Sequence, residues 1–143
     1  MSAITTTASW IHHITGALDA KNLTYAVNRY NDVTLAVDDA EYVIRNTASV
    51  VPQRIHMLGY PAAQVTAQPA DVEGITIRQE FENISVRARG RALLDHEGRV
   101  YFDLICIAGE PGEVPSQAQL EELLPQLIVL MTQMQQQLRT AGV

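Results

Sequence analysis

The chain has 143 residues, sixteen acidic and ten basic side chains, and a formal net charge of −6. This length suits a single domain, residues 1–143, whose core needs neither disulfides nor a structural metal. The negative charge disfavours non-specific binding to nucleic acid, because the field around the molecule repels phosphate backbones.

The first twenty residues lack the basic start and continuous apolar stretch of a signal peptide. No apolar run is longer than Leu127 to Met131, which is too short to cross a membrane. We therefore expect no membrane partner. The sequence favours a location in the cytoplasm or in an assembled virion.

The N-terminal third contains a helix pattern followed by two alternating segments. Trp10, Ile14 and Leu18 fall at helical spacing, which predicts a short helix over roughly residues 8–20. Apolar and polar residues then alternate in 23–27 and 33–37, as in strands. Asn31 and Asp32 between them are typical turn residues, so we expect a hairpin here.

The middle of the chain has signals of both helix and strand. Asp38 to Glu41 has the acid-x-x-Glu form of a helix start, which favours a helix over 39–49, although Tyr42 to Ile44 also suits a strand. Pro52 predicts a further helical turn that Gly59 would end. Residues 61–74 are expected to form a surface loop or a short helical turn.

The clearest pattern is a β-hairpin over 84–108. Apolar residues occupy the even positions on both sides of the loop His96-Glu97-Gly98, which is the period of a strand with one buried face. Gly98 suits the left-handed position that a three-residue hairpin loop requires. The preceding strand, 75–81, has its apolar residues at odd positions, so we expect a bulge or turn at Glu82-Asn83.

The register of the hairpin follows from its loop, because residues that face the same core must lie opposite one another. Asp95 is then opposite Arg99, and small side chains oppose large ones on the core face. The predicted core pairs are Leu94–Val100, Ala92–Phe102, Gly90–Leu104 and Ala88–Cys106. Cys106, the only cysteine, is therefore expected to be a buried apolar residue.

The other face of the hairpin combines basic and apolar side chains, and we regard it as a candidate partner interface. The simpler interpretation is a solvated face partly neutralised by Asp103, and the pattern leaves both open. If the face binds a partner, an acidic protein fits better than nucleic acid, since a second copy of this chain is itself acidic. The residues of this face are Arg87, Arg89, Arg91, Tyr101, Ile105 and Ile107.

A long helix is expected over 117–140. Ser116 and Gln119 match a capping box, and Pro125 should bend the first turns. Every residue from Leu127 to Met131 is apolar, although one sheet covers only one side of a helix. This predicts a partner, most simply another copy of the chain, at Leu127, Ile128, Val129, Leu130, Met131 and Met134.

The sequence contains no recognisable catalytic, cofactor or metal motif. His12 and His13 are adjacent, so on a helix they point apart and cannot hold one ion together. His96 lies between two acidic residues, but a polar turn explains this arrangement better than a metal site. His56 has no obvious partner. We therefore expect no catalytic residues, no cofactor and no metal.

Together these patterns predict an α+β fold. The antiparallel sheet is centred on the hairpin, with the long C-terminal helix and the short N-terminal helix packed against it. The expected function is a non-enzymatic protein–protein interaction or assembly module. It would be homo-oligomeric or part of a larger particle, such as a phage tail connector or terminator. A small acidic chaperone that binds apolar segments of a client is the alternative, and a small enzyme comes third.

Overall fold

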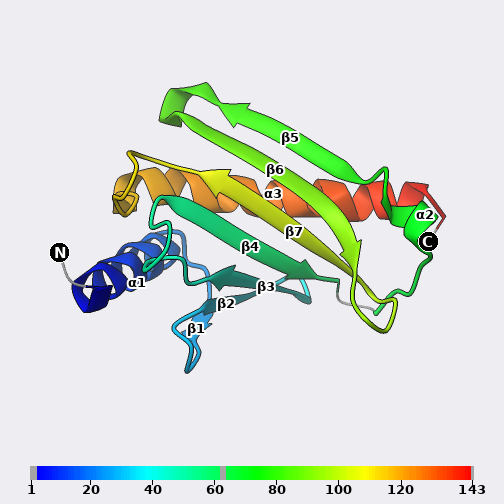
Figure 1. Cartoon of the computed structure of the whole chain (residues 1–143), viewed down its shortest axis with the longest axis horizontal. Coiled ribbons are helices and arrows are strands. Elements are labelled where there is room, and N and C mark those ends of the chain that lie inside the picture. The colour runs from blue at the N-terminus through cyan, green and yellow to red at the C-terminus, as the bar shows by residue number, and fades with distance from the viewer. Residues whose placement is uncertain (1–2, 62–63, 143) are drawn as a thin grey trace.

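A computed structural model describes residues 3–61 and 64–142. One seven-stranded antiparallel sheet, in the order β1-β2-β3-β4-β7-β6-β5, forms the centre of the molecule. The long helix α3 runs lengthwise behind β5, β6 and β7, and α1 lies beside it (Figure 1). The predicted α+β fold, with both helices packed against an antiparallel sheet, is confirmed.

The elements divide the chain into two antiparallel meanders, each connected in sequence order. β4 and β7 join the meanders, so that β7 lies between β4 and β6 at the middle of the sheet. The first part of the chain comprises α1 (Ala3–Ala20), β1 (Tyr25–Val27), β2 (Val33–Val37), β3 (Ala40–Arg45) and β4 (Arg54–Tyr60). The second part comprises α2 (Pro69–Val72), β5 (Thr76–Phe81), the 3₁₀ turn Glu82–Ile84, β6 (Val86–Leu94), β7 (Val100–Ile107) and α3 (Gln117–Thr140).

The hairpin between β6 and β7 has the predicted register at every pair, from Leu94 opposite Val100 to Ala88 opposite Cys106. Gly98 adopts the expected left-handed conformation, with φ at 78°. The parity change before β6 also occurs where it was expected. The 3₁₀ turn and Ser85, whose φ is 54°, rotate the chain between β5 and β6.

The helix expected over 39–49 is wrong, because these residues contain strand β3. Asp38 and Asp39 have φ values of 49° and 68° and form the two-residue turn of a tight hairpin between β2 and β3. Aspartate tolerates this left-handed conformation, and such a turn matches the twist of the flanking strands. The acidic residues that resemble a helix start are therefore turn residues.

The helical turn expected after Pro52 is also wrong, because Arg54–Tyr60 is strand β4. Ile55 and Met57 are fully buried, while Arg54, His56 and Leu58, which alternate with them, face the opposite side of the sheet. Gly59 does not end a helix. A Cβ atom there would lie 2.9 Å from Sδ of Met131, so the missing side chain makes room for α3.

The two helices depart from their predicted forms only at their ends. α1 begins at Ala3, earlier than the predicted start near residue 8. α3 has the predicted bounds, and the Ser116 hydroxyl accepts a hydrogen bond from the Gln119 N–H at 3.2 Å. The Gln119 side chain does not complete the capping box; it donates to the Ile84 carbonyl at 3.1 Å.

The core lies between the sheet and the two helices. Trp10, Ile14 and Leu18 of α1 are fully buried, as their spacing predicts. They belong to one hydrophobic cluster that also contains inward side chains of β2 to β7 and of α3. None of the described helices is long and apolar enough to span a membrane. The described helices all lie on one side of the sheet, so the central strands expose their other face.

Candidate binding surface

The uncovered side of the sheet, which we call the open face, is built by the alternation of side chains along five neighbouring strands. Its middle rows run across β5, β6, β7, β4 and β3, where the cross-strand pairs bring residues distant in sequence side by side. The open face comprises Glu41, Val43, Arg45, Arg54, His56, Leu58, Tyr60, Thr76, Arg78, Glu80, Arg87, Arg89, Arg91, Leu93, Tyr101, Asp103, Ile105 and Ile107.

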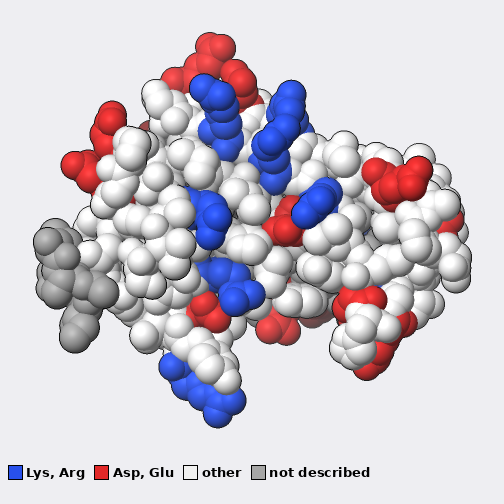
Figure 2. Space-filling model, viewed as in Figure 1, with Lys and Arg blue, Asp and Glu red and all other residues white. Residues whose placement is uncertain are grey.

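Four exposed arginines, Arg78 on β5 and Arg87, Arg89 and Arg91 on β6, form what we call the arginine cluster. Arg78 lies directly opposite Arg89, and like charges in this position repel each other. None of the ion pairs between described residues involves these four side chains. Figure 2 shows basic side chains gathered over the middle of this face, with most acidic ones around its rim.

Asp103 lies opposite Arg91, but its carboxylate is engaged elsewhere. The His56 Nε2 atom is 2.6 Å from its Oδ1 atom, and both side chains are largely buried, with 23% and 14% exposed. Asp103 therefore does not form an ion pair with the arginines that it was expected to neutralise. His56, which had no obvious partner in the sequence, supplies the contact instead.

An apolar strip runs beside the arginine cluster on β7 and β4. Ile105 and Tyr101 are half-buried, whereas Ile107 exposes 47% of its surface. Leu58 of β4 lies next to Asp103 and widens the strip. Arg89 is opposite Ile105 and Arg87 is opposite Ile107, so two of the four arginines adjoin an apolar side chain of the strip.

A shallow hollow of about 590 Å³ lies in the arginine cluster. Thr76, Arg78, Arg89, Arg91, Asp103 and Ile105 contribute to its wall. Three guanidinium groups outnumber the single carboxylate of Asp103 in this lining, which suits an anionic group such as a carboxylate.

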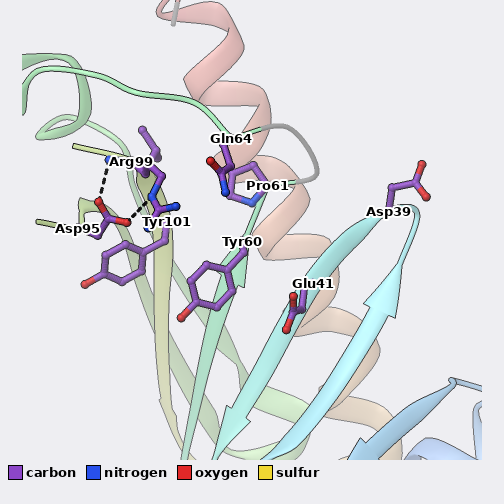
Figure 3. A pocket seen from close by; sticks show the side chains of 9 residues that line it. Asp39, Glu41, Tyr60, Pro61, Gln64, Asp95, Arg99 and Tyr101 are labelled. Carbon is purple, nitrogen blue, oxygen red and sulfur yellow. Dashed lines mark hydrogen bonds and ion pairs between the residues drawn. The ribbon is translucent and has the colours of Figure 1, made fainter. Parts of the chain in front are cut away.

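A second, smaller pocket of about 350 Å³ lies at the end of the open face near the hairpin turns (Figure 3). Tyr60 and Tyr101 stack there, with ring centroids 6.2 Å apart. Burial raises the pKa of the Tyr60 hydroxyl above its ordinary value of 10.0. Figure 3 places Glu41 beside Tyr60, on the neighbouring strand.

Arg99, which also lines this second pocket, is already neutralised. Its Nε atom lies 2.9 Å from the Asp95 carboxylate, and its Nη2 atom is 3.4 Å from Glu97. Hydrogen bonds from the backbone N–H groups of Arg99 and Glu97, together with this guanidinium, lower the pKa of Asp95. These contacts stabilise the hairpin turn. They distinguish Arg99 from the four residues of the arginine cluster.

Four of the six residues proposed as a helix interface are covered by the chain itself. Leu127, Met131 and Met134 are fully buried, and Leu130 is 4% exposed. Both α1 and the sheet pack against α3, and these four residues belong to the hydrophobic cluster that the three share. Val129 is 54% exposed and Ile128 is half-buried, so these two residues are the apolar surface that remains.

The remaining candidate residues have structural contacts. The Nδ1 atom of His13 lies 2.8 Å from the Pro115 carbonyl oxygen, which links α1 to the start of α3. His96 is exposed and lies 3.4 Å from Glu97. Over residues 3–61 and 64–142, no group of histidine, cysteine and acidic side chains is arranged to hold a metal ion.

The sequence located the β6 and β7 part of the open face but missed the contributions of β3 and β4. Arg54, His56, Leu58 and Tyr60 were assigned to a helical turn and a loop, although Ile55 and Met57 alternate with them. That alternation is the signal that predicts the strand. Comparison with protein-family models and with curated protein sequences found no match for this chain.

Proposed function

We propose that this protein is a non-enzymatic protein–protein interaction module whose open face binds an acidic surface of a partner protein. The observation that carries the proposal is the arginine cluster. Its four guanidinium groups lie on neighbouring strands without an ion pair to any described residue. Carboxylates of a partner would relieve their mutual repulsion and form bidentate hydrogen bonds with them.

The distribution of charge supports an acidic partner. The open face has six arginines and three carboxylates, a net formal charge of +3, in a chain whose total is −6. The remainder of the chain therefore has −9. Two open faces would repel each other, so a second copy fits only head to tail, with its acidic remainder on the open face.

The apolar strip favours a protein over nucleic acid. The side chains opposite or next to the β6 arginines and Asp103 are aliphatic, namely Ile105, Ile107 and Leu58. The two aromatic rings, Tyr60 and Tyr101, stack on each other at the end of the face near the hairpin turns, whereas a nucleic-acid groove would offer aromatic rings along the basic residues for bases to stack on. Charge complementarity with an apolar centre is typical of protein interfaces. We place such an interaction in the cytoplasm or in an assembled particle, for example a phage tail.

A chaperone for apolar client segments is the second candidate, and the exposure of Ile107 and Tyr60 on the open face favours it. A chaperone would bind an unfolded client more tightly than the folded one. An assembly module would bind its folded partner.

The test is to purify the tagged protein from its native cells and identify the proteins bound to it. Each candidate partner is then purified, and its affinity is measured by titration calorimetry. We expect Arg87→Glu combined with Arg89→Glu to weaken binding at least about tenfold, because two attractive contacts become repulsive. Arg29→Glu is the control, since Arg29 packs on Tyr30 in the β1–β2 turn. Equal affinity of the wild-type protein, the double variant and the Arg29→Glu control for the partner would contradict the proposal.

A further inference from the structure

The arginines of β6 and the apolar side chains of β7 lie in neighbouring rows, as on a surface that binds an amphipathic helix. We propose, on the basis of the function proposed above, that the partner element on the open face is an amphipathic α-helix lying along β6 and β7. Such a helix has a stripe of acidic side chains next to a stripe of apolar ones. The acidic stripe contacts the arginine cluster, and the apolar stripe contacts Ile105, Ile107 and Tyr101.

The two strips lie side by side over the same length of the sheet. Arg91, Arg89 and Arg87 project from alternate positions of β6 and are opposite Asp103, Ile105 and Ile107 of β7. Beside Arg89 and Arg87 the boundary between charged and apolar surface therefore runs parallel to the strands, and beside Arg91 the strip contains the Asp103 carboxylate. A partner must present charge on one side of a line and apolar surface on the other.

The spacing of the arginines matches that of a helix. Alternate residues of an antiparallel strand are about 6.8 Å apart, so Arg87 and Arg91 are separated by about 13.6 Å. Residues i, i+4 and i+8 of an α-helix lie about 6 Å apart along its axis and span about 12 Å. Acidic residues with this spacing would meet the three arginines of β6 in order. Apolar residues at i+3 and i+7 form the adjacent stripe.

The architecture also favours a helix over an extended segment. The long helix α3 already lies lengthwise along the other face of β5, β6 and β7, so these strands have a length and twist on which a helix packs (Figure 1). An extended segment would need the free edge of β5. There the carbonyl of Thr76 accepts a hydrogen bond from Gln137 of α3 at 3.1 Å, and Arg78 and Glu80 are charged. Both features oppose the addition of a strand.

The experiment uses the full chain and three fluorescent peptides in anisotropy titrations. The first peptide is helical, with Glu at i, i+4 and i+8 and Leu at i+3 and i+7. The second has the same composition in scrambled order, and the third is an extended peptide of alternating Glu and Val. We expect the helical peptide to bind at least about tenfold more tightly than the other two.

Charge reversal provides the matched control. Arg87→Glu combined with Arg89→Glu should abolish binding of the helical peptide. A peptide with Lys at i, i+4 and i+8 should bind this variant and not the wild-type protein. Arg29→Glu should bind the original peptide as the wild-type protein does.

The outcomes separate this inference from the proposed function. Equal binding of the helical and scrambled peptides would overturn the inference of a helical partner but leave the proposal of an acidic partner intact. Tightest binding of the alternating peptide would replace the helix by an added strand. If no peptide binds, the helix inference is overturned, whereas the calorimetry of purified partners decides the function. Tighter binding of a single-stranded oligonucleotide than of any peptide would overturn both.

Discussion

At the scale of single residues, the environment of Cys106 has a measurable consequence. The side chain is 1% exposed, and this burial raises the pKa of the thiol to about 12 from an ordinary value of 9.0. Buried in an apolar environment, the thiol stays protonated and unreactive in the folded protein. The sequence predicted this burial from the even-numbered pattern of the hairpin.

We expect the stability of the folded state to fall with rising pH above about 9. The unfolded chain loses the thiol proton near its ordinary pKa, while the folded chain keeps it up to about 12. Each pH unit in this window costs about 1.4 kcal/mol of unfolding free energy. Urea unfolding at pH 8 and pH 10.5 should show a loss about 2 kcal/mol larger in the wild-type protein than in Cys106→Ala. Equal losses would contradict the burial of this thiol.

At the scale of elements, the close contact of α3 with the sheet depends on Gly90 in β6. A Cβ atom at this position would lie 2.8 Å from Cε of Met134 and 2.9 Å from Cγ2 of Ile77. Met134 is flexible, but the branched Ile77 side chain has little freedom to move away. The glycine therefore sets the distance between helix and strand.

Gly90→Ala should destabilise the protein by about 1–3 kcal/mol, because the added methyl group overpacks this contact. Gly74→Ala is the control, since a Cβ atom there meets nothing within 4 Å. Both variants add one methyl group, and urea unfolding measures both. Equal stability of the two variants would show that α3 does not approach β6 as closely as described.

The elements that sequence patterns predicted correctly are those with strong local signals. The β6–β7 hairpin has a period of two on both strands and a glycine, Gly98, at the loop position with a positive φ. The sequence patterns missed β3 and β4 because nearby residues resemble the ends of helices. The two aspartates before β3 form a turn, and Pro52 lies before β4 while Gly59 lies near its end. Strand order is a property of the tertiary structure, so no local pattern placed β4 next to β7.

The candidate site was predictable to the extent that it lies on the hairpin. All six sheet residues proposed as an interface lie on the open face. The contact between His56 and Asp103 could not be predicted, because it joins strands whose pairing was unknown. The apolar turn of α3 suggested a partner because the contact of α1 with α3 was also unknown.

At the scale of the whole molecule, charge is separated between the open face and the remainder. This favours head-to-tail contact between copies and opposes contact between two open faces. At about 50 mM salt we expect light scattering to show an average mass above the 15.8 kDa of one chain, rising with concentration. Raising the salt to about 300 mM should reduce this average mass, since screening weakens contacts between exposed charges. A compact dimer that resists salt, or one chain at every salt concentration, would contradict this expectation.

The position of β7 between β4 and β6 also determines when the sheet can be completed during synthesis. β4 ends at Tyr60, whereas its neighbour β7 begins only at Val100. Until β7 is made, one edge of β4 is unpaired, and its inward side chains, Ile55 and Met57, have a neighbouring strand, β3, on one side only. Pairing of such distant segments is slow, because the intervening loop must close first. The nascent chain should therefore be most prone to aggregation while it contains the first meander alone.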